Sequence, residues 1–391
     1  MIIKTKYYVA LFILLLCTGF STQLFSINNT AFTIRVLLDE PLLETTSWTV
    51  ESEDGIVAIN IDNRTEKKIY KKTVLIELKN KKLLLNNKPC DYKSISLSPR
   101  KKNALLTFKK VGYEGSFLVL FFNNNYYLIN AIESEKYVGS VVSKESWPGW
   151  PKELNRAFAI ICRTYVLSKV LTARNKRAKG TAKVPYDIKN TNIHQTYGGG
   201  VIPPVLKEAV LETEGIIIAY NKQPIEAMFD ACCGGAITSK MQGIDFKKAP
   251  YLSRKYACTH CKNCKLYTWS ASYSIKELVK LFEQDFPDLK TIKEVKITSR
   301  DGAGFVQTLM IRDKTQTCTL TGKRLYSLLK KIKSTRFTLT REKDILTFHG
   351  KGYGHCLGVC QWGACSMVEK GHTYKEVISF YYPHTTLMKI K

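Results

Sequence analysis

Short apolar runs, bounded by Asn, Asp, Gly and Lys, follow one another over residues 33–130. They are rich in β-branched and aromatic residues, which favour strands. Lysines cluster at the turns between the runs, where charge discourages pairing of exposed sheet edges. The pattern predicts a strand-rich N-terminal part over residues 30–130.

The apolar period changes after Asn130. Apolar residues recur at helical spacing in 152–171, and Pro151 suits the first turn of a helix there. Further helices are predicted at 134–142, 204–213, 274–286, 325–332 and 374–381, a hairpin at 215–230, and a mobile basic loop at 172–184. Strands followed by mixed helices and strands predict an α+β fold, in which residues 131–391 form the mixed helix/strand part that carries the candidate chemistry.

The N-terminus is typical of an export signal. Lys4 and Lys6 precede an apolar run over 7–17, and small residues follow it. The run is short for a transmembrane helix. We expect a signal peptide over residues 1–22, with an uncleaved anchor as the alternative, and a mature protein in the periplasm or cell envelope. Two leucines before Cys17 argue against a lipoprotein site.

The formal net charge is +27, from 60 Lys and Arg against 33 Asp and Glu. Nucleic acid would attract such a chain, but export argues against that partner. Cell-wall and lipid surfaces are anionic and attract basic proteins. A solvated basic surface without a dedicated partner is the alternative.

Cysteines gather in the C-terminal half of the chain. Cys258, Cys261 and Cys264 form a C-x-x-C-x-x-C run, with His260 inside it. This spacing suits a zinc site, whereas disulfides are the usual state of cysteines in exported proteins. Both alternatives stand for these four residues.

Two stretches carry candidate chemistry. Glu145 lies between a predicted helix and a break that contains Trp147 and Trp150. Aromatic neighbours reduce the solvation of a carboxyl group and favour its protonated form, which can donate a proton to a glycosidic oxygen. The tryptophans offer flat faces to a sugar. An exposed glutamate beside a turn is the alternative.

The second stretch is FHGKGYGHCLGVCQWGA, residues 348–364. Its glycines allow tight turns and close backbone approach around His355, and Gln361 follows. Both side chains can hydrogen-bond a sugar hydroxyl. The alternative is a histidine that only fixes the glycine loop.

These stretches resemble a known family. The run at 348–364 is similar to G-x-G-x-G-H-G-x-G-x-S-Q-x-G-A of the SpoIID/LytB family, whose members act on bacterial cell-wall glycan. YVGSVVSKESWPGWP, RTY, HQTYGG and ETEGIIIAY resemble further family motifs in the same order. The resemblance covers residues 130–391 and, loosely, the strands before them.

The resemblance implies roles for individual residues. Glu145 matches the catalytic glutamate of the family. The residues implied to orient the glycan strand are Arg156, Arg163, Gln195, Tyr197, His355 and Gln361. Arg156 stands where lysine is usual, and Phe158 where glutamine is common.

The glycine loop also departs from the family pattern. Cys356 replaces a glycine, so its side chain is expected to forbid a positive φ. A disulfide from Cys356 to Cys232 or Cys233 is an alternative. Cys360 replaces a serine of the family.

The implied activity is that of a lytic transglycosylase. It would cleave the β-1,4 bond between N-acetylmuramic acid and N-acetylglucosamine, in glycan stripped of stem peptides, during division or development. No cofactor is required for this reaction. Two rival interpretations remain: a non-enzymatic wall-binding enhancer of an N-acetylmuramoyl-L-alanine amidase, and a cysteine-rich envelope protein cross-linked through its thiols.

Overall fold

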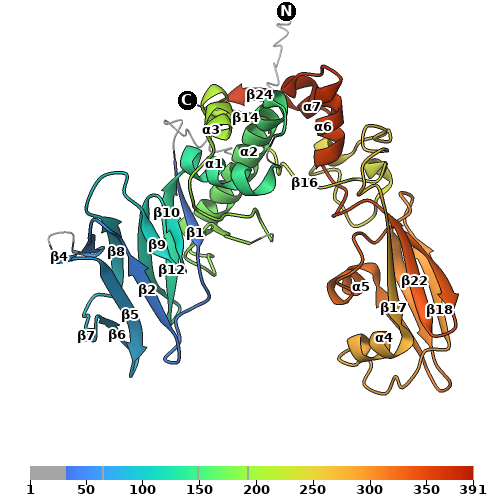
Figure 1. The fold of residues 1–391 in the computed structure, drawn as a ribbon, viewed down its shortest axis with the longest axis horizontal. Helices are drawn as coiled ribbons and strands as arrows, with labels where there is room; N and C mark the ends of the chain where they lie inside the picture. The colour runs from blue at the N-terminus through green and yellow to red at the C-terminus, as the bar shows by residue number, and fades with distance from the viewer. Residues whose placement is uncertain (1–31, 64–65, 148, 192, 391) are drawn as a thin grey trace, which may run out of the picture.

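The computed structural model describes residues 32–63, 66–147, 149–191 and 193–390 (Figure 1). The predicted signal peptide lies outside these residues. Within them, no helix combines the length and the apolar character needed to cross a bilayer. The described chain forms an arch, with sheets on both sides and helices between them at the top (Figure 1).

Two sheets form the N-terminal side, as the strand pattern predicted. Most of their buried residues belong to one core, because alternate side chains of each strand point inward. Leu37, Tyr127 and Ile129 of the larger sheet form a separate small cluster. The larger sheet has the order β13 (Ile188–Lys189), β1 (Thr33–Leu37), β12 (Asn125–Glu133), β11 (Ser116–Phe122), β8 (Ser94–Pro99), β3 (Ile56–Asn60) and β4 (Lys67–Tyr70). The smaller has the order β10 (Val111–Tyr113), β9 (Leu106–Phe108), β2 (Ser47–Glu51), β5 (Thr73–Lys79), β6 (Lys82–Leu85) and β7 (Lys88–Pro89).

Helix α2 (Lys152–Ala178) is the centre of the arch and packs on its neighbours through an apolar face. Its neighbours are α1 (Ser134–Glu145), α3 (Pro204–Glu212), α6 (Gln361–Glu369) and α7 (Tyr374–Tyr381). The helix continues past the predicted end at residue 171, because the basic stretch that follows contains good helix formers. The predicted basic loop at 172–184 is therefore wrong over its first half.

The predicted hairpin at 215–230 is only partly correct. Asn221 and Lys222 form its turn with positive φ, as a two-residue hairpin requires. However, the second strand, β15 (Gln223–Pro224), is short. The first strand, β14 (Ile216–Tyr220), pairs along its length with β24 (Thr386–Lys389). The chain then forms β16 (Phe229–Asp230), which pairs in parallel with β23 (Val359–Cys360).

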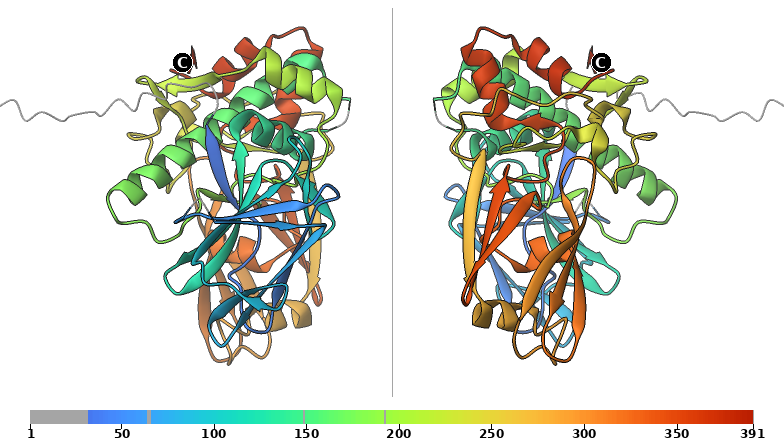
Figure 2. Two further views of the ribbon diagram at one scale, coloured as in Figure 1. Left: turned by 90° about the vertical axis from the view of Figure 1, so that its left-hand side faces the viewer. Right: turned by 90° about the vertical axis from the view of Figure 1, so that its right-hand side faces the viewer.

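The far side of the arch has its own cluster of buried residues. Its strands and helices face the viewer in the right-hand view of Figure 2. Its sheets are β17 (Thr268–Ser274), β22 (Ile345–Lys351) and β21 (Phe337–Glu342), and β18 (Glu294–Arg300), β19 (Val306–Arg312) and β20 (Thr317–Thr321). Helices α4 (Ile275–Phe282) and α5 (Gly322–Leu328) supply apolar side chains, and two short 3-10 helices, Thr238–Lys240 and Pro250–Leu252, precede this part. Ser274 caps α4, because its side chain accepts from the Glu277 N–H. The whole is an α+β fold, as predicted.

Candidate functional site

A pocket of about 460 Å³ opens where the end of α1, the 193–196 loop, β16 and the glycine loop meet. The motif residues Glu145, His355 and Gln361 all line it. The other lining residues include His194 and Asp230. Segments far apart in sequence thus bring together two carboxyl groups, two imidazoles and an amide.

Glu145 is the last residue of α1 and is half-buried. Its Oε1 accepts a hydrogen bond of 2.7 Å from the Thr196 N–H. Within the described residues, no group hydrogen-bonds the other carboxyl oxygen, Oε2. The carboxyl is therefore held at one oxygen and open to a ligand at the other.

Gln361 ties the glycine loop to this glutamate. Its Nε2 donates to the Glu145 carbonyl oxygen over 3.0 Å. The next residue, Trp362, lies with its ring 6.3 Å from that of Trp147 and 6.5 Å from that of Trp150. Trp147 is 56% exposed. The three tryptophans thus form an aromatic cluster close in sequence to Glu145 and Gln361, although none of them is among the lining residues of the pocket.

His355 keeps part of its ring exposed in the pocket. Its Nδ1 accepts from the Leu357 N–H over 3.0 Å, so this nitrogen carries no proton. Loss of hydration by burial lowers the pKa of His355 below its usual value. The imidazole is therefore neutral at neutral pH and presents Nε2 as a donor.

The glycine loop needs its glycines where it crosses β16. A Cβ on Gly354, which has φ +118°, would approach the Asp230 Cβ to 2.6 Å. The expectation for Cys356 is wrong, because this residue adopts φ +62° despite its side chain. The conformation is held by its N–H, which donates to Asp230 Oδ2, and by burial of its thiol.

Asp230 is the pocket residue that the motifs missed. It is 7% exposed, and its Oδ1 has no hydrogen-bond partner within the described residues. Burial raises the pKa of this carboxyl well above its usual range. The only signal in the sequence is an acidic residue at the end of an apolar stretch, two positions before Cys232 of the Cys-Cys-Gly-Gly turn.

His194 also lines the pocket. Its Nδ1 accepts from the Lys189 N–H over 3.3 Å. Burial, with the charges of Lys169 and Lys189, lowers the pKa of His194. A second neutral imidazole therefore borders Glu145.

Three of the residues expected to orient a glycan lie away from the pocket, in the core. The Gln195 amide accepts from the Tyr137 hydroxyl over 3.2 Å. The Tyr197 hydroxyl donates to Asn130 over 2.5 Å, and its ring stacks on Tyr137. Arg163 is fully buried. These side chains fix the scaffold below the pocket rather than touching a ligand.

The fourth, Arg156, lies on the side of α2. It pairs with Glu153 and, over 2.7 Å, with Glu212. Hydrogen bonds to Glu212 and Glu153 raise the pKa of this arginine. Arg156 is therefore engaged with α3 and is not among the lining residues of the pocket.

The eleven cysteines of the described chain are all free thiols. Cys356 therefore forms no disulfide with Cys232 or Cys233. Of the predicted zinc ligands, Cys258 and Cys261 lie together with Cys233 and Cys360, but His260 and Cys264 do not join them. His260 packs against Phe380 instead, and the Cys264 thiol accepts from the Leu266 N–H.

Comparison with known proteins identifies two segments. Residues 122–220, which carry α1, α2 and Glu145, match the family model described as stage II sporulation protein (SpoIID). The chain thus contains a SpoIID domain and is similar to SpoIID and amidase-enhancer proteins. Residues 247–358, which contain the second core, match a domain of unknown function, DUF8618.

The similar full-length proteins agree with this assignment. An uncharacterised protein of Brachyspira hyodysenteriae is 28% identical over 279 residues, covering 71% of this chain and 72% of that protein. Stage II sporulation protein D of Bacillus subtilis is 26% identical, covering 66% of this chain and 75% of its own. The amidase enhancer of the same organism is 26% identical over 63% of this chain but only 39% of its own length. The SpoIID domain and these similarities support a role related to the cell wall.

Proposed function

We propose that this protein is an exported peptidoglycan lytic transglycosylase that uses Glu145 as both acid and base. The observation that supports it most is the position of Glu145. Its carboxyl is anchored by the Thr196 N–H, open at its second oxygen, and set in a pocket that also contains His194, His355 and Gln361. A protonated carboxyl in that position is suited to protonating a glycosidic oxygen.

The reaction needs one carboxyl group. Glu145 donates its proton to the oxygen between N-acetylmuramic acid and N-acetylglucosamine as the bond from that oxygen to C1 breaks. The C6 hydroxyl of the same muramic acid then bonds C1, and Glu145 takes the hydroxyl proton. The product has a 1,6-anhydro end, no water is consumed, and the acid is regenerated.

The neighbouring groups suit a sugar polymer. The neutral imidazoles of His355 and His194 offer N–H donors without adding charge. A second pocket of about 630 Å³ shares Ile193, Gly354 and His355 with the first. The two together give a strand room on either side of His355.

The products test the proposal. Glycan strands, with and without stem peptides, are incubated with the purified protein, and the new ends are analysed by mass spectrometry. Ends lighter by one water than reducing ends are expected, with peptide-free glycan cleaved faster. Ordinary reducing ends would mean hydrolysis, which needs a second carboxylate. Asp230 would then be the residue to test, through Asp230→Asn.

A wall-binding amidase enhancer is the second candidate. The similarity to the Bacillus subtilis amidase enhancer and the charge of +27 favour it. Binding of glycan without cleavage, together with faster release of stem peptides by an added N-acetylmuramoyl-L-alanine amidase, would support this function.

Glycan binding is expected to weaken in acid through His355. Burial lowers the pKa of His355 in the folded protein below the unfolded value of about 6.5, so the imidazole is neutral, as glycan binding requires, at neutral pH. The neutral form of His355 is lost as the pH falls through its lower pKa in the folded protein. A proton on Nδ1 then removes the acceptor of the Leu357 N–H, which weakens the loop that binds glycan. Affinity for peptide-free glycan, measured by fluorescence anisotropy from about pH 8 to 4, should fall over that range.

The variant His355→Asn isolates this effect, because an asparagine oxygen replaces Nδ1 as acceptor and does not titrate. Its affinity should depend less on pH than that of the wild type. His194→Asn is the matched comparison, since His194 has the same kind of bond. An unchanged pH profile in both variants would assign the dependence to a group other than these two histidines.

A further inference from the structure

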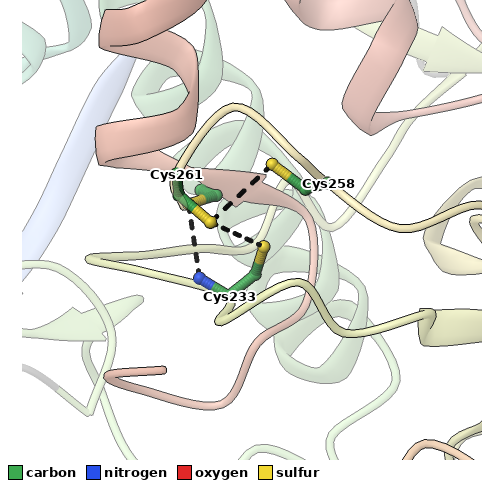
Figure 3. Close-up of side chains that lie close together, drawn as sticks. Cys233, Cys258 and Cys261 are labelled. Carbon is green, nitrogen blue, oxygen red and sulfur yellow. Dashed lines mark hydrogen bonds between the residues drawn. The ribbon is translucent and has the colours of Figure 1, made fainter. Parts of the chain in front are cut away.

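We infer that Cys233, Cys258, Cys261 and Cys360 form a structural zinc site. The four thiols are buried, and their sulfur atoms all lie within 4.8 Å of one another. They come from the turn after β16, the 258–264 loop, and the N-terminal end of α6. Figure 3 shows three of them, Cys233, Cys258 and Cys261, with their sulfurs turned toward one another.

The spacing fits one tetrahedral ion. Sulfurs bound to zinc at about 2.3 Å lie about 3.8 Å apart, the edge of the tetrahedron. The Cys233 and Cys261 sulfurs are 3.7 Å apart, and those of Cys258 and Cys261 are 3.9 Å apart. Sulfurs in a disulfide lie about 2.05 Å apart. Cys232, whose thiol interacts with Cys261 and Cys360, borders the four without belonging to the set.

The surroundings suit the charge of such a site. Four thiolates around Zn²⁺ leave a charge of about −2. Arg254 is 1% exposed, and its Nη2 lies 4.0 Å from the Cys233 sulfur. Among the described residues, no carboxylate pairs with this arginine and its Nη1 has no partner. A buried positive charge without a carboxylate is expensive unless another negative group balances it.

Backbone and hydroxyl donors complete the shell. The N–H groups of Cys233 and Gly363 each lie 3.3 Å from the Cys360 sulfur, which caps α6. The Tyr381 hydroxyl lies 3.2 Å from the Cys258 sulfur. Gly363 leaves room for this arrangement, because a Cβ there would lie 3.0 Å from the Cys258 sulfur and 2.2 Å from the Tyr381 hydroxyl. Donors of this kind orient and stabilise metal-bound thiolates.

The site has a structural consequence. Cys360 directly precedes Gln361, and Cys233 follows Asp230 by three positions, so both walls of the pocket are attached to the ligands. The zinc ion fixes the 258–264 loop to these walls. The site has no open position for substrate, because all four ligands are protein thiols.

Metal analysis of the purified full chain, prepared without added metals or chelators, tests the assignment. About one zinc ion per chain is expected in elemental analysis by inductively coupled plasma mass spectrometry. Iron in place of zinc, or no metal, would overturn it. Without reductant, denatured protein should take an alkyl label at all four cysteines, as mapped on peptides. Disulfides among the four would leave them unlabelled and would also overturn it.

Variants locate the ion. Cys258→Ser and Cys360→Ser should bind little zinc, whereas Cys264→Ser and Cys318→Ser should keep about one ion. Cys264 is the matched control because it belongs to the same C-x-x-C-x-x-C run. If the ligand variants do not fold, release of zinc from the wild type by a chelator, with new alkylation at the four cysteines and not at Cys318, decides the question. Since no substrate is involved, this result is independent of glycan cleavage.

Discussion

Glu145→Gln should abolish the formation of anhydro ends from glycan. Loss of a general acid and base lowers the rate by about 10²–10⁴-fold, and here one group serves in both roles. Glutamine has nearly the same shape, and its oxygen keeps the hydrogen bond from the Thr196 N–H. The expected variant is therefore folded and binds glycan, but does not cleave it. Mass spectrometry of the glycan ends provides the measurement.

Glu212→Gln is the control for this substitution. Glu212 lies on α3, where hydrogen bonds from Arg156 and Lys152 lower its pKa to about 2. Its loss should leave cleavage unchanged, since it does not line the pocket. If the Glu145→Gln variant still cleaves glycan, Glu145 is not the acid and base of the reaction. Asp230 is then the remaining carboxyl group in the pocket. Wild-type protein that binds glycan without cutting it would favour the amidase enhancer.

The sequence motifs include Glu145, His355 and Gln361, which the fold brings together in one pocket. Gln361 and Glu145 are 216 positions apart, yet they are joined by a hydrogen bond. No periodicity predicts such a contact. It depends on the parallel pairing of β16 with β23 and on a glycine loop that passes close to Asp230.

The same motifs could not separate residues at the pocket from residues beneath it. Arg163, Gln195 and Tyr197 are polar and belong to family motifs, so they resemble ligand-binding residues in sequence. Their partners, such as Tyr137 and Asn130, lie on other elements and satisfy them inside the core. Asp230 was missed for the opposite reason, because a carboxyl in an apolar strand has no motif of its own.

The cysteines illustrate a third limit. Local spacing suggested Cys258, His260, Cys261 and Cys264 as one set, but only Cys258 and Cys261 lie in the cluster of four. The other two members are Cys233 and Cys360, which are distant in sequence. Pairings of this kind depend on the fold and cannot be read from spacing.

Arg163→Leu should lower the free energy of unfolding by about 3–5 kcal/mol, because it leaves a buried charge unpaired. The Arg163 guanidinium is fully buried and binds Glu135 through two bonds, of 2.8 and 2.6 Å. It also donates to the carbonyl oxygens of Val210 and Ile216. It thereby joins α1, α2, α3 and β14. Chemical denaturation monitored by tryptophan fluorescence provides the measurement.

Two comparisons separate this scaffold role from glycan binding. Arg156→Leu, on the same helix, breaks a partly exposed pair and should cost about 1 kcal/mol or less. The double variant Arg163→Leu, Glu135→Leu removes both buried charges and should recover part of the lost stability. If Arg163 acts only through the fold, glycan affinity per folded molecule stays unchanged in Arg163→Leu. If the variant is stable but no longer binds glycan, Arg163 contacts glycan directly. That result would contradict the position assigned to Arg163 beneath the pocket.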